Sequence, residues 1–243
     1  HELPLTIGPG DATAGSREFL PVGVGRSPFW LDDRTFGFVR SVKAGDNVVP
    51  GETEIVMASL EDPTPLNLVS STELFAQLTE DIPPRGSSNL SIGFVAAHPN
   101  QPGRLFIVAL DDLVERAYLI VYDLDSGMAE VRMQLLFTLN LSLSFSPAGR
   151  YVVMTGQDNN ATSPGNDASI LLMHNIEENN TTPFIPRTPF VLPAVVHDWS
   201  DDSRWLAIVM EDNLIGMVAP DSGYTRLLPR AVGSCTSVAW LRE

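Results

Sequence analysis

The stretch His197–Leu228, HDWSDDSRWLAIVMEDNLIGMVAPDSGYTRLL, contains four short apolar segments that are separated by polar turns. The first segment ends at Trp199, and serine and aspartate residues follow it. Residues 205–210 are apolar throughout, which is typical of a strand whose two faces are both buried. The turn at 221–223, Asp-Ser-Gly, is typical of a tight hairpin in which glycine adopts a positive φ. We therefore predict four short strands joined by turns.

The same order of features recurs along the rest of the chain: an aromatic anchor, a polar turn, an apolar run and an aspartate-rich turn. The anchors are Trp30, Phe94, Phe145, Trp199 and Trp240. Their spacing is roughly 40–65 residues, and repeats of about 40–50 residues with four strands each are typical of propeller blades. An irregular β-sandwich is the competing interpretation, but a sandwich does not require this repeated order.

We predict an all-β fold, a β-propeller of four-stranded blades, with about five blades and a range of four to six. The repeats cover residues 27–241, and residues 1–26 supply closing strands, so that the chain forms one domain. Residues 235–241 look like the first strand of a fifth unit, which strands from residues 3–24 would complete. Closure of the ring by the N- and C-terminal strands would hide edges that an open ring exposes. Between the first two units, residues 72–79 predict one or two helical turns.

Two of the repeats carry residues that match the motif of a known family. Residues 145–150, Phe-Ser-Pro-Ala-Gly-Arg, and 199–204, Trp-Ser-Asp-Asp-Ser-Arg, resemble the W-S-P-D-G-R motif of the TolB-type, WD-like β-propeller repeat. Trp30–Arg34 is a shortened copy, and Phe94–Arg104 is a diverged copy with an insertion at the turn. The copies depart from the motif, for example at Ala148, which replaces the usual acidic residue. The resemblance implies short sheets around a central channel.

The charge of the chain restricts the partners that it can bind. Its 243 residues include 30 acidic and 15 basic side chains, and the formal net charge is −15. Binding to nucleic acids or to anionic membranes depends on Lys and Arg, so we expect neither. A cationic partner, or more commonly solubility alone, explains such a charge. No apolar run approaches the ~18 residues of a membrane helix, and we expect no membrane insertion of this segment.

No motif of a catalytic or cofactor site is present in the sequence. The chain lacks G-x-S-x-G, H-E-x-x-H, P-loop, G-x-G-x-x-G and C-x-x-C patterns. The single cysteine, Cys235, excludes an intramolecular disulfide, and its expected role is that of a small buried residue. We therefore predict no catalytic residue, no metal and no cofactor, with calcium or another divalent cation as the alternative.

Two histidines are candidate binding residues. His98 and His197 both lie near the end of a predicted first strand, so we expect them to face the same end of the channel. Asp198 lies beside His197, and imidazoles with a carboxylate are a common set of metal ligands. The alternative role, packing or hydrogen bonding in a turn, is the more common one for histidines in repeats.

A long polar loop is the second candidate site. The loop at residues 156–169 carries Asp158, Asn160 and Asp167. Oxygen-rich loops can hold calcium, although the spacing here fits no EF-hand, and most such loops are only loops. A long loop between blade strands is also a candidate for contact with a partner. The four tryptophans, by contrast, are expected to pack between blades, and a sugar-stacking platform is the alternative.

From these observations we predict a non-enzymatic binding module that works outside the cytoplasm. Loops at one end of its channel would bind a protein or a small ligand. The chain begins at His1 and not at methionine, which the removal of an export signal would explain. The alternative is an enzyme or the propeller part of one, a hydrolase or lyase acting on a saccharide or peptide, because propeller enzymes gather side chains from several blades. A propeller that only supports a larger assembly is a third interpretation, since fold alone does not choose among these.

Overall fold

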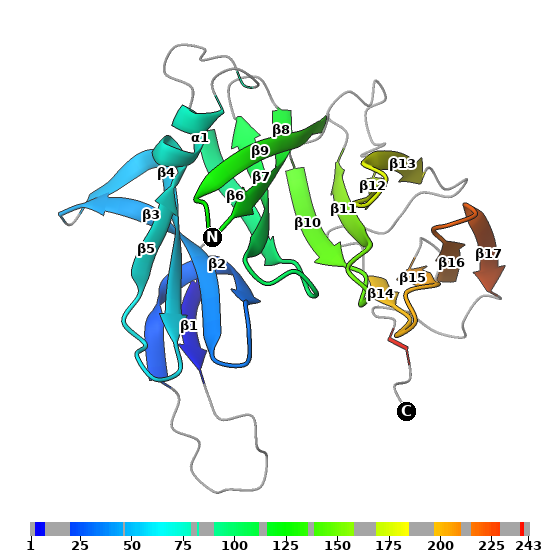
Figure 1. Cartoon of the computed structure of the whole chain (residues 1–243), viewed down its shortest axis with the longest axis horizontal. Coiled ribbons are helices and arrows are strands. Elements are labelled where there is room, and N and C mark those ends of the chain that lie inside the picture. Colours follow the sequence, from blue (N-terminus) through cyan, green and yellow to red (C-terminus); the bar gives the residue numbers. More distant parts are fainter. Residues whose placement is uncertain are drawn as a thin grey trace, which may run out of the picture. The chain divides into compact units, whose positions relative to one another are not determined.

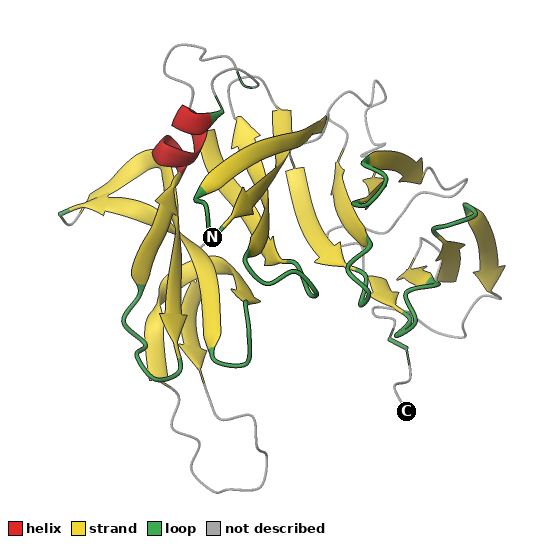
Figure 2. Cartoon of the chain, viewed as in Figure 1, coloured by secondary structure: helices red, strands yellow, loops and turns green. Residues whose placement is uncertain are grey.

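The computed structural model describes residues 3–7, 20–45, 47–78, 82, 90–111, 116–135, 139–157, 169–184, 197–209, 215–228 and 239–240. These residues form antiparallel strands and one short helix (Figures 1 and 2). The chain divides into two compact units, residues 1–135 and residues 136–243. No helix among the residues described is both long enough and apolar enough to cross a membrane.

The first unit contains two antiparallel sheets in which each strand pairs with the next strand along the chain. The first sheet consists of β1 (Leu3–Ile7), β2 (Leu20–Trp30), β3 (Thr35–Ala44), β4 (Asn47–Ser59) and β5 (Leu66–Ser70). The second sheet consists of β6 (Leu90–Ala97), β7 (Arg104–Asp111), β8 (Arg116–Asp123) and β9 (Met128–Leu135). This meander of neighbouring strands is the blade topology that the repeats predict.

The second unit also contains two antiparallel sheets with the same sequential strand order. One consists of β10 (Leu139–Phe145), β11 (Tyr151–Gln157), β12 (Ser169–Asn175) and β13 (Asn180–Phe184). The other consists of β14 (His197–Trp199), β15 (Leu206–Val209), β16 (Ile215–Ala219) and β17 (Tyr224–Leu228). The four strands that the stretch 197–228 predicts are therefore confirmed.

The described residues form four such sheets, which lies within the predicted range of four to six blades but below the expected five. The N-terminal strands account for part of this difference. β1 pairs with the first half of β2, and the second half of β2 pairs with β3, so both strands belong to the first sheet. A bulge between Arg26 and Phe29, with Ser27 at a φ of 51°, separates the two halves. Of residues 235–241, only 239–240 are described, and they are not in a strand.

The turn that follows the first repeat strand shows which residues are equivalent in the four sheets. In each sheet the backbone N–H of the residue after the anchor donates to a carbonyl across the turn: Leu31 to Thr35 (2.9 Å), His98 to Arg104 (3.0 Å), Ser146 to Tyr151 (2.9 Å) and Ser200 to Trp205 (2.9 Å). The anchors are thus Trp30, Ala97, Phe145 and Trp199. The assignment of Phe94 as an anchor was wrong by three residues. The second repeat has no aromatic side chain at this position, because residue 97 is an alanine and Phe94 lies three residues before it.

The core of the first unit lies between its two sheets. Phe29, Val39 and Ile55 of the first sheet join Ile92 and Leu105 of the second in one buried cluster. β8 is buried from Ala117 to Tyr122, as expected for a strand with two dry faces. The predicted helical turns are present as α1 (Ser71–Gln77), which Ser70 and Glu73 cap reciprocally and which buries Leu74 in this core.

The core of the second unit is built in the same way. Tyr151, Val153, Leu171 and Met173 of one sheet pack with Trp199, Leu206, Ile208 and Val218 of the other. β15 is buried along its whole length, which confirms the interpretation of the apolar run in the last repeat. The ring of Trp199 stacks on that of Tyr151 with 6.3 Å between centroids. This tryptophan therefore has the packing role that the repeat predicts.

Candidate binding site

The predicted loop site lies outside the residues that the structure describes. Asp158, Asn160 and Asp167 all belong to the segment 158–168, so a role of this loop in binding calcium or a partner stays a prediction. Within the described ranges, no group of three or more His, Cys, Asp or Glu side chains is arranged to hold a metal ion.

His98 is a turn residue of the second sheet. It directly follows β6, takes the position of Ser146 and Ser200, and is buried. Its Nδ1 accepts a hydrogen bond from the backbone N–H of Asn100 (3.2 Å), and its ring packs against Phe106 with 6.0 Å between centroids. Because Nδ1 is an acceptor here, the proton of the neutral ring lies on Nε2.

His197 lies at a different position of its sheet. It is the first residue of β14, two residues before the anchor Trp199, whereas His98 is one residue after its anchor Ala97. The two histidines therefore do not occupy equivalent positions, and the expectation that both face the same end of the channel stays a prediction. The Nε2 of His197 is 2.5 Å from the Oγ of Ser144 on β10, so this histidine links the two sheets of its unit.

Both carboxylate oxygens of Asp198 accept hydrogen bonds from backbone N–H groups, Oδ1 from Trp199 (3.0 Å) and Oδ2 from Trp240 (2.8 Å). The indole N–H of Trp240 also donates to the carbonyl of Asp198 (3.0 Å). Asp198 therefore holds Trp240 beside β14. This side chain has a structural role that occupies both of its oxygens.

The first unit has a groove at the turns that follow β2 and β6. It encloses about 450 Å³ and is lined by Trp30, Leu31, Asp32, Asp33, Ala97, His98 and Pro99. We call this the Trp30 groove. It includes one residue that the sequence singled out, His98, which forms part of its wall. No lysine or arginine is among the described residues that line it.

Trp30 is the most unusual residue of this groove. It occupies the same repeat position as Trp199, but 55% of its surface is exposed, against 4% for Trp199. Trp199 is covered by Tyr151 of the neighbouring sheet, whereas the ring contact found for Trp30 is with Phe36 of its own sheet, at 5.6 Å and 59°. One repeat position therefore holds a packing residue in the second unit and an accessible aromatic surface in the first.

The two aspartates of the groove differ in their surroundings. Oδ1 of Asp32 accepts hydrogen bonds from the backbone N–H groups of Arg34 and Thr35, both at 2.7 Å, and these bonds hold the pKa of its carboxyl below the usual value. Asp33 makes no hydrogen bond or ion pair to any described residue. The nearby Arg34 pairs with Glu61 at 2.6 Å. The groove thus carries two carboxylates, and one of them is free to meet a ligand.

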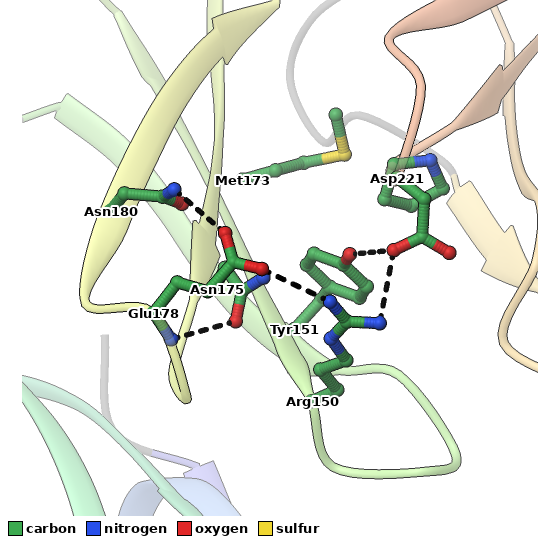
Figure 3. Close-up of a pocket in the computed structure, with 8 residues that line it drawn as sticks. Arg150, Tyr151, Met173, Asn175, Glu178, Asn180 and Asp221 are labelled. Carbon is green, nitrogen blue, oxygen red and sulfur yellow. Dashed lines mark hydrogen bonds and ion pairs between the residues drawn. The ribbon is translucent and has the colours of Figure 1, made fainter.

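A second, smaller pocket lies in the second unit (Figure 3). It encloses about 150 Å³, and Arg150 is one of its lining residues, with its guanidinium between Glu178 and Asp221. The guanidinium of Arg150 forms ion pairs with Asp221 (3.1 Å), Glu178 (3.2 Å) and Glu177 (3.5 Å). Its charge is therefore already neutralised, and the pocket does not offer an anion a free cation.

The groups around Arg150 hold the two sheets of the second unit together. The phenol of Tyr151, at the start of β11, donates a short hydrogen bond to Asp221, in the turn between β16 and β17 (Figure 3). Burial, and after it the hydrogen bond to Asp221, together raise the pKa of Tyr151 to about 12. Another hydrogen bond between the turns of the two sheets runs from the backbone N–H of Ala148 to Ser203 Oγ, at 2.8 Å. We interpret this pocket as a junction between sheets, because each of its charged groups has a partner.

Comparison with known proteins identifies the fold alone. No family model matches the sequence, and no curated protein matches it. Among solved structures, the chain is similar to the β-propeller domain of the Trilobed protease from Pyrococcus furiosus, with a TM-score of 0.57, 11% identity, and coverage of 86% of this chain and 57% of that one. It is also similar to oligogalacturonate lyase from Vibrio parahaemolyticus, with a TM-score of 0.56, 9% identity, and coverage of 89% of this chain and 58% of that one. For the Dos1 propeller the TM-score is 0.53, the identity is 10%, and the coverage is 91% of this chain and 51% of that one.

The sheet topology and these similarities define the class of the protein: its fold is that of a β-propeller. The chain spans little more than half the length of each of the three solved chains. Those chains are a domain of a protease, a lyase and the Dos1 propeller. The similarity therefore does not decide whether this chain acts as an enzyme or as a binding module.

Proposed function

We propose that this chain is a binding module of the TolB-type propeller class, that it works outside the cytoplasm, and that it binds a protein partner or a ligand in the Trp30 groove. One observation supports the site above all others. At the anchor position, Trp199 of the second unit is buried, whereas Trp30 of the first unit is more than half exposed. Trp30 lies in a groove that also contains the unpaired carboxylate of Asp33. Exposed aromatic side chains are enriched at sites of recognition because they offer a large apolar area that is rigid.

The other parts of this proposal rest on the sequence. The TolB-type assignment is supported by the motif copies at residues 145–150 and 199–204. Both copies form the turn after the first strand of a sheet, where the backbone N–H of Ser146 or Ser200 closes the turn.

The test is capture of a partner by the immobilised chain from an envelope extract, followed by a binding curve. We expect saturable binding that is strongly reduced by Trp30→Ala. Tyr224→Ala is the matched control, because Tyr224 is an aromatic residue of the second unit with the same exposure, 56%. Replacement of residues 158–168 by Gly and Ser tests the competing loop site. Binding that survives Trp30→Ala but is lost with the loop replacement would reject the groove.

An enzyme remains the second candidate, because one contact has the geometry of an activated nucleophile. Ser144 Oγ and His197 Nε2 are 2.5 Å apart, and a serine hydroxyl next to a histidine base is the arrangement used in nucleophilic catalysis. A hydrolase acting through Ser144 would be labelled covalently by a fluorophosphonate probe, and Ser144→Ala would abolish the label. An unlabelled wild-type protein would leave this contact with its structural role only.

A further inference from the structure

We infer that the Trp30 groove takes the cationic side chain of a lysine or arginine from a peptide segment of the partner. This inference rests on the proposed function, because it names the chemistry of the ligand for the same groove. It is carried by three features of the described residues: the free carboxylate of Asp33, the exposed indole of Trp30 and the lack of a competing cation in the groove.

The charges of the groove favour a cation. Two backbone N–H groups donate hydrogen bonds to Asp32 and stabilise its ionised form. Asp33 has no hydrogen-bond or ion-pair partner among the described residues. Arg34 is the cation closest in sequence, but its guanidinium pairs with Glu61. An ammonium or guanidinium group that enters the groove therefore meets negative charge that no lining residue neutralises. At physiological salt, screening over about 8 Å leaves this attraction effective only at close range.

The indole of Trp30 can contact the apolar stem of a lysine or arginine side chain as well as its charged end. A lysine or arginine side chain is an apolar stem with a charged end, and tryptophan is the aromatic residue that binds cations best over its face. The ring of Trp30 already packs on Phe36, so its orientation costs little entropy to fix on binding. Asp33 follows Trp30 by three residues in the same turn, and both line the groove. A cation held there can contact both groups.

The charge of the whole chain acts in the same direction at longer range. With 30 acidic and 15 basic residues, the protein attracts basic segments and repels acidic ones. This general attraction alone does not identify a site. The experiment must therefore separate binding in the groove from attraction by the net charge.

The test uses immobilised heptapeptides that differ only at the central residue, which is lysine, arginine, ε-acetyl-lysine or glutamine. We expect the wild-type protein to bind the lysine and arginine peptides about fivefold more strongly than the ε-acetyl-lysine peptide, the effect expected of a cation at an exposed tryptophan. Trp30→Leu and Asp33→Asn should each remove most of this preference. Asp125→Asn, which removes one exposed carboxylate from another turn of the first unit, is the matched control and should preserve it.

Two results would overturn the inference. One is equal binding of the lysine and ε-acetyl-lysine peptides, and the other is a lysine preference that Trp30→Leu and Asp33→Asn leave unchanged, since net charge alone would then explain it. If the partner captured from the extract is lost with Trp30→Ala while the peptides show no preference for lysine, the inference fails and the proposed function stands. Thermal unfolding of each variant verifies that it is folded.

Discussion

At the scale of single residues, the two anchor tryptophans show that one motif position can have two different surroundings. Trp199 is buried against Tyr151, and Trp30 lies at the surface of the groove. The sequence could not separate them, because the difference depends on which side chain of a neighbouring sheet covers the ring. The structural role of Trp199 was predictable from the repeat, whereas the exposure of Trp30 was not.

This difference predicts unequal effects on stability. Trp199→Ala should reduce the free energy of unfolding by about 3–5 kcal/mol, because it removes a fully packed aromatic ring. Trp30→Ala should reduce it by less than about 1 kcal/mol, because most of this ring already contacts solvent. Urea denaturation of the two variants measures both effects. An equally large loss for Trp30→Ala would mean that this ring is covered in solution, and the groove would lose its main ligand-binding surface.

The raised pKa of Tyr151 predicts that the stability of the fold decreases at alkaline pH. Its pKa is raised to about 12, mainly by burial and then by the hydrogen bond to Asp221, whereas an unfolded tyrosine titrates near 10. Above pH 10 the unfolded chain therefore binds fewer protons at this residue than the folded chain does. Stability from this group is complete below pH 10 and is lost as pH rises towards 12. Tyr151→Phe should flatten the fall in melting temperature over this range, and an unchanged slope would contradict the assignment.

At the scale of elements, the repeat predicted the strands well and the turns less well. Burial along β8 and β15 confirmed the apolar runs as strands with two dry faces. The anchor of the second sheet was misplaced, because Ala97 carries no aromatic signal and the turn from His98 to Gly103 is longer than the others. The pairing of the N-terminal strands with the first sheet was not predictable from the repeat, because it depends on β2 being long enough to pair with β1 and β3 in turn.

The capped N-terminus of helix α1, which is not part of the repeat, is expected to contribute to the stability of the fold. Ser70 Oγ accepts from the backbone N–H of Glu73, and the Glu73 carboxylate accepts from the backbone N–H of Ser70. Ser70→Ala should lower the free energy of unfolding by about 1 kcal/mol. Thr72→Ala, at an exposed position of the same helix, is the control: it leaves the cap intact, removes only the exposed hydrogen bond from Thr72 Oγ1 to Glu52 (2.9 Å), and should have a smaller effect. A thermal unfolding curve that distinguishes neither variant from wild type would show that the cap does not stabilise the helix.

At the scale of the whole molecule, the fold was predictable and the site was not. The strand pattern of a blade recurs in every repeat, so one sequence carries several copies of the signal for the fold. The Trp30 groove is formed only once, by turns that are more than sixty residues apart. The predicted site residues illustrate this. His98 lines the groove, His197 and Asp198 have structural partners elsewhere, and the loop residues lie outside the described ranges.

The most direct test of the binding site is oxidative footprinting of the whole chain with and without its captured partner. Hydroxyl radicals modify exposed aromatic side chains, so Trp30 and Tyr224, with 55% and 56% exposure, should react at similar rates in the free protein. Binding at the groove predicts that the partner protects Trp30 and leaves Tyr224 unchanged. Protection of Tyr224 or of the segment 158–168, with Trp30 still fully reactive, would contradict the account.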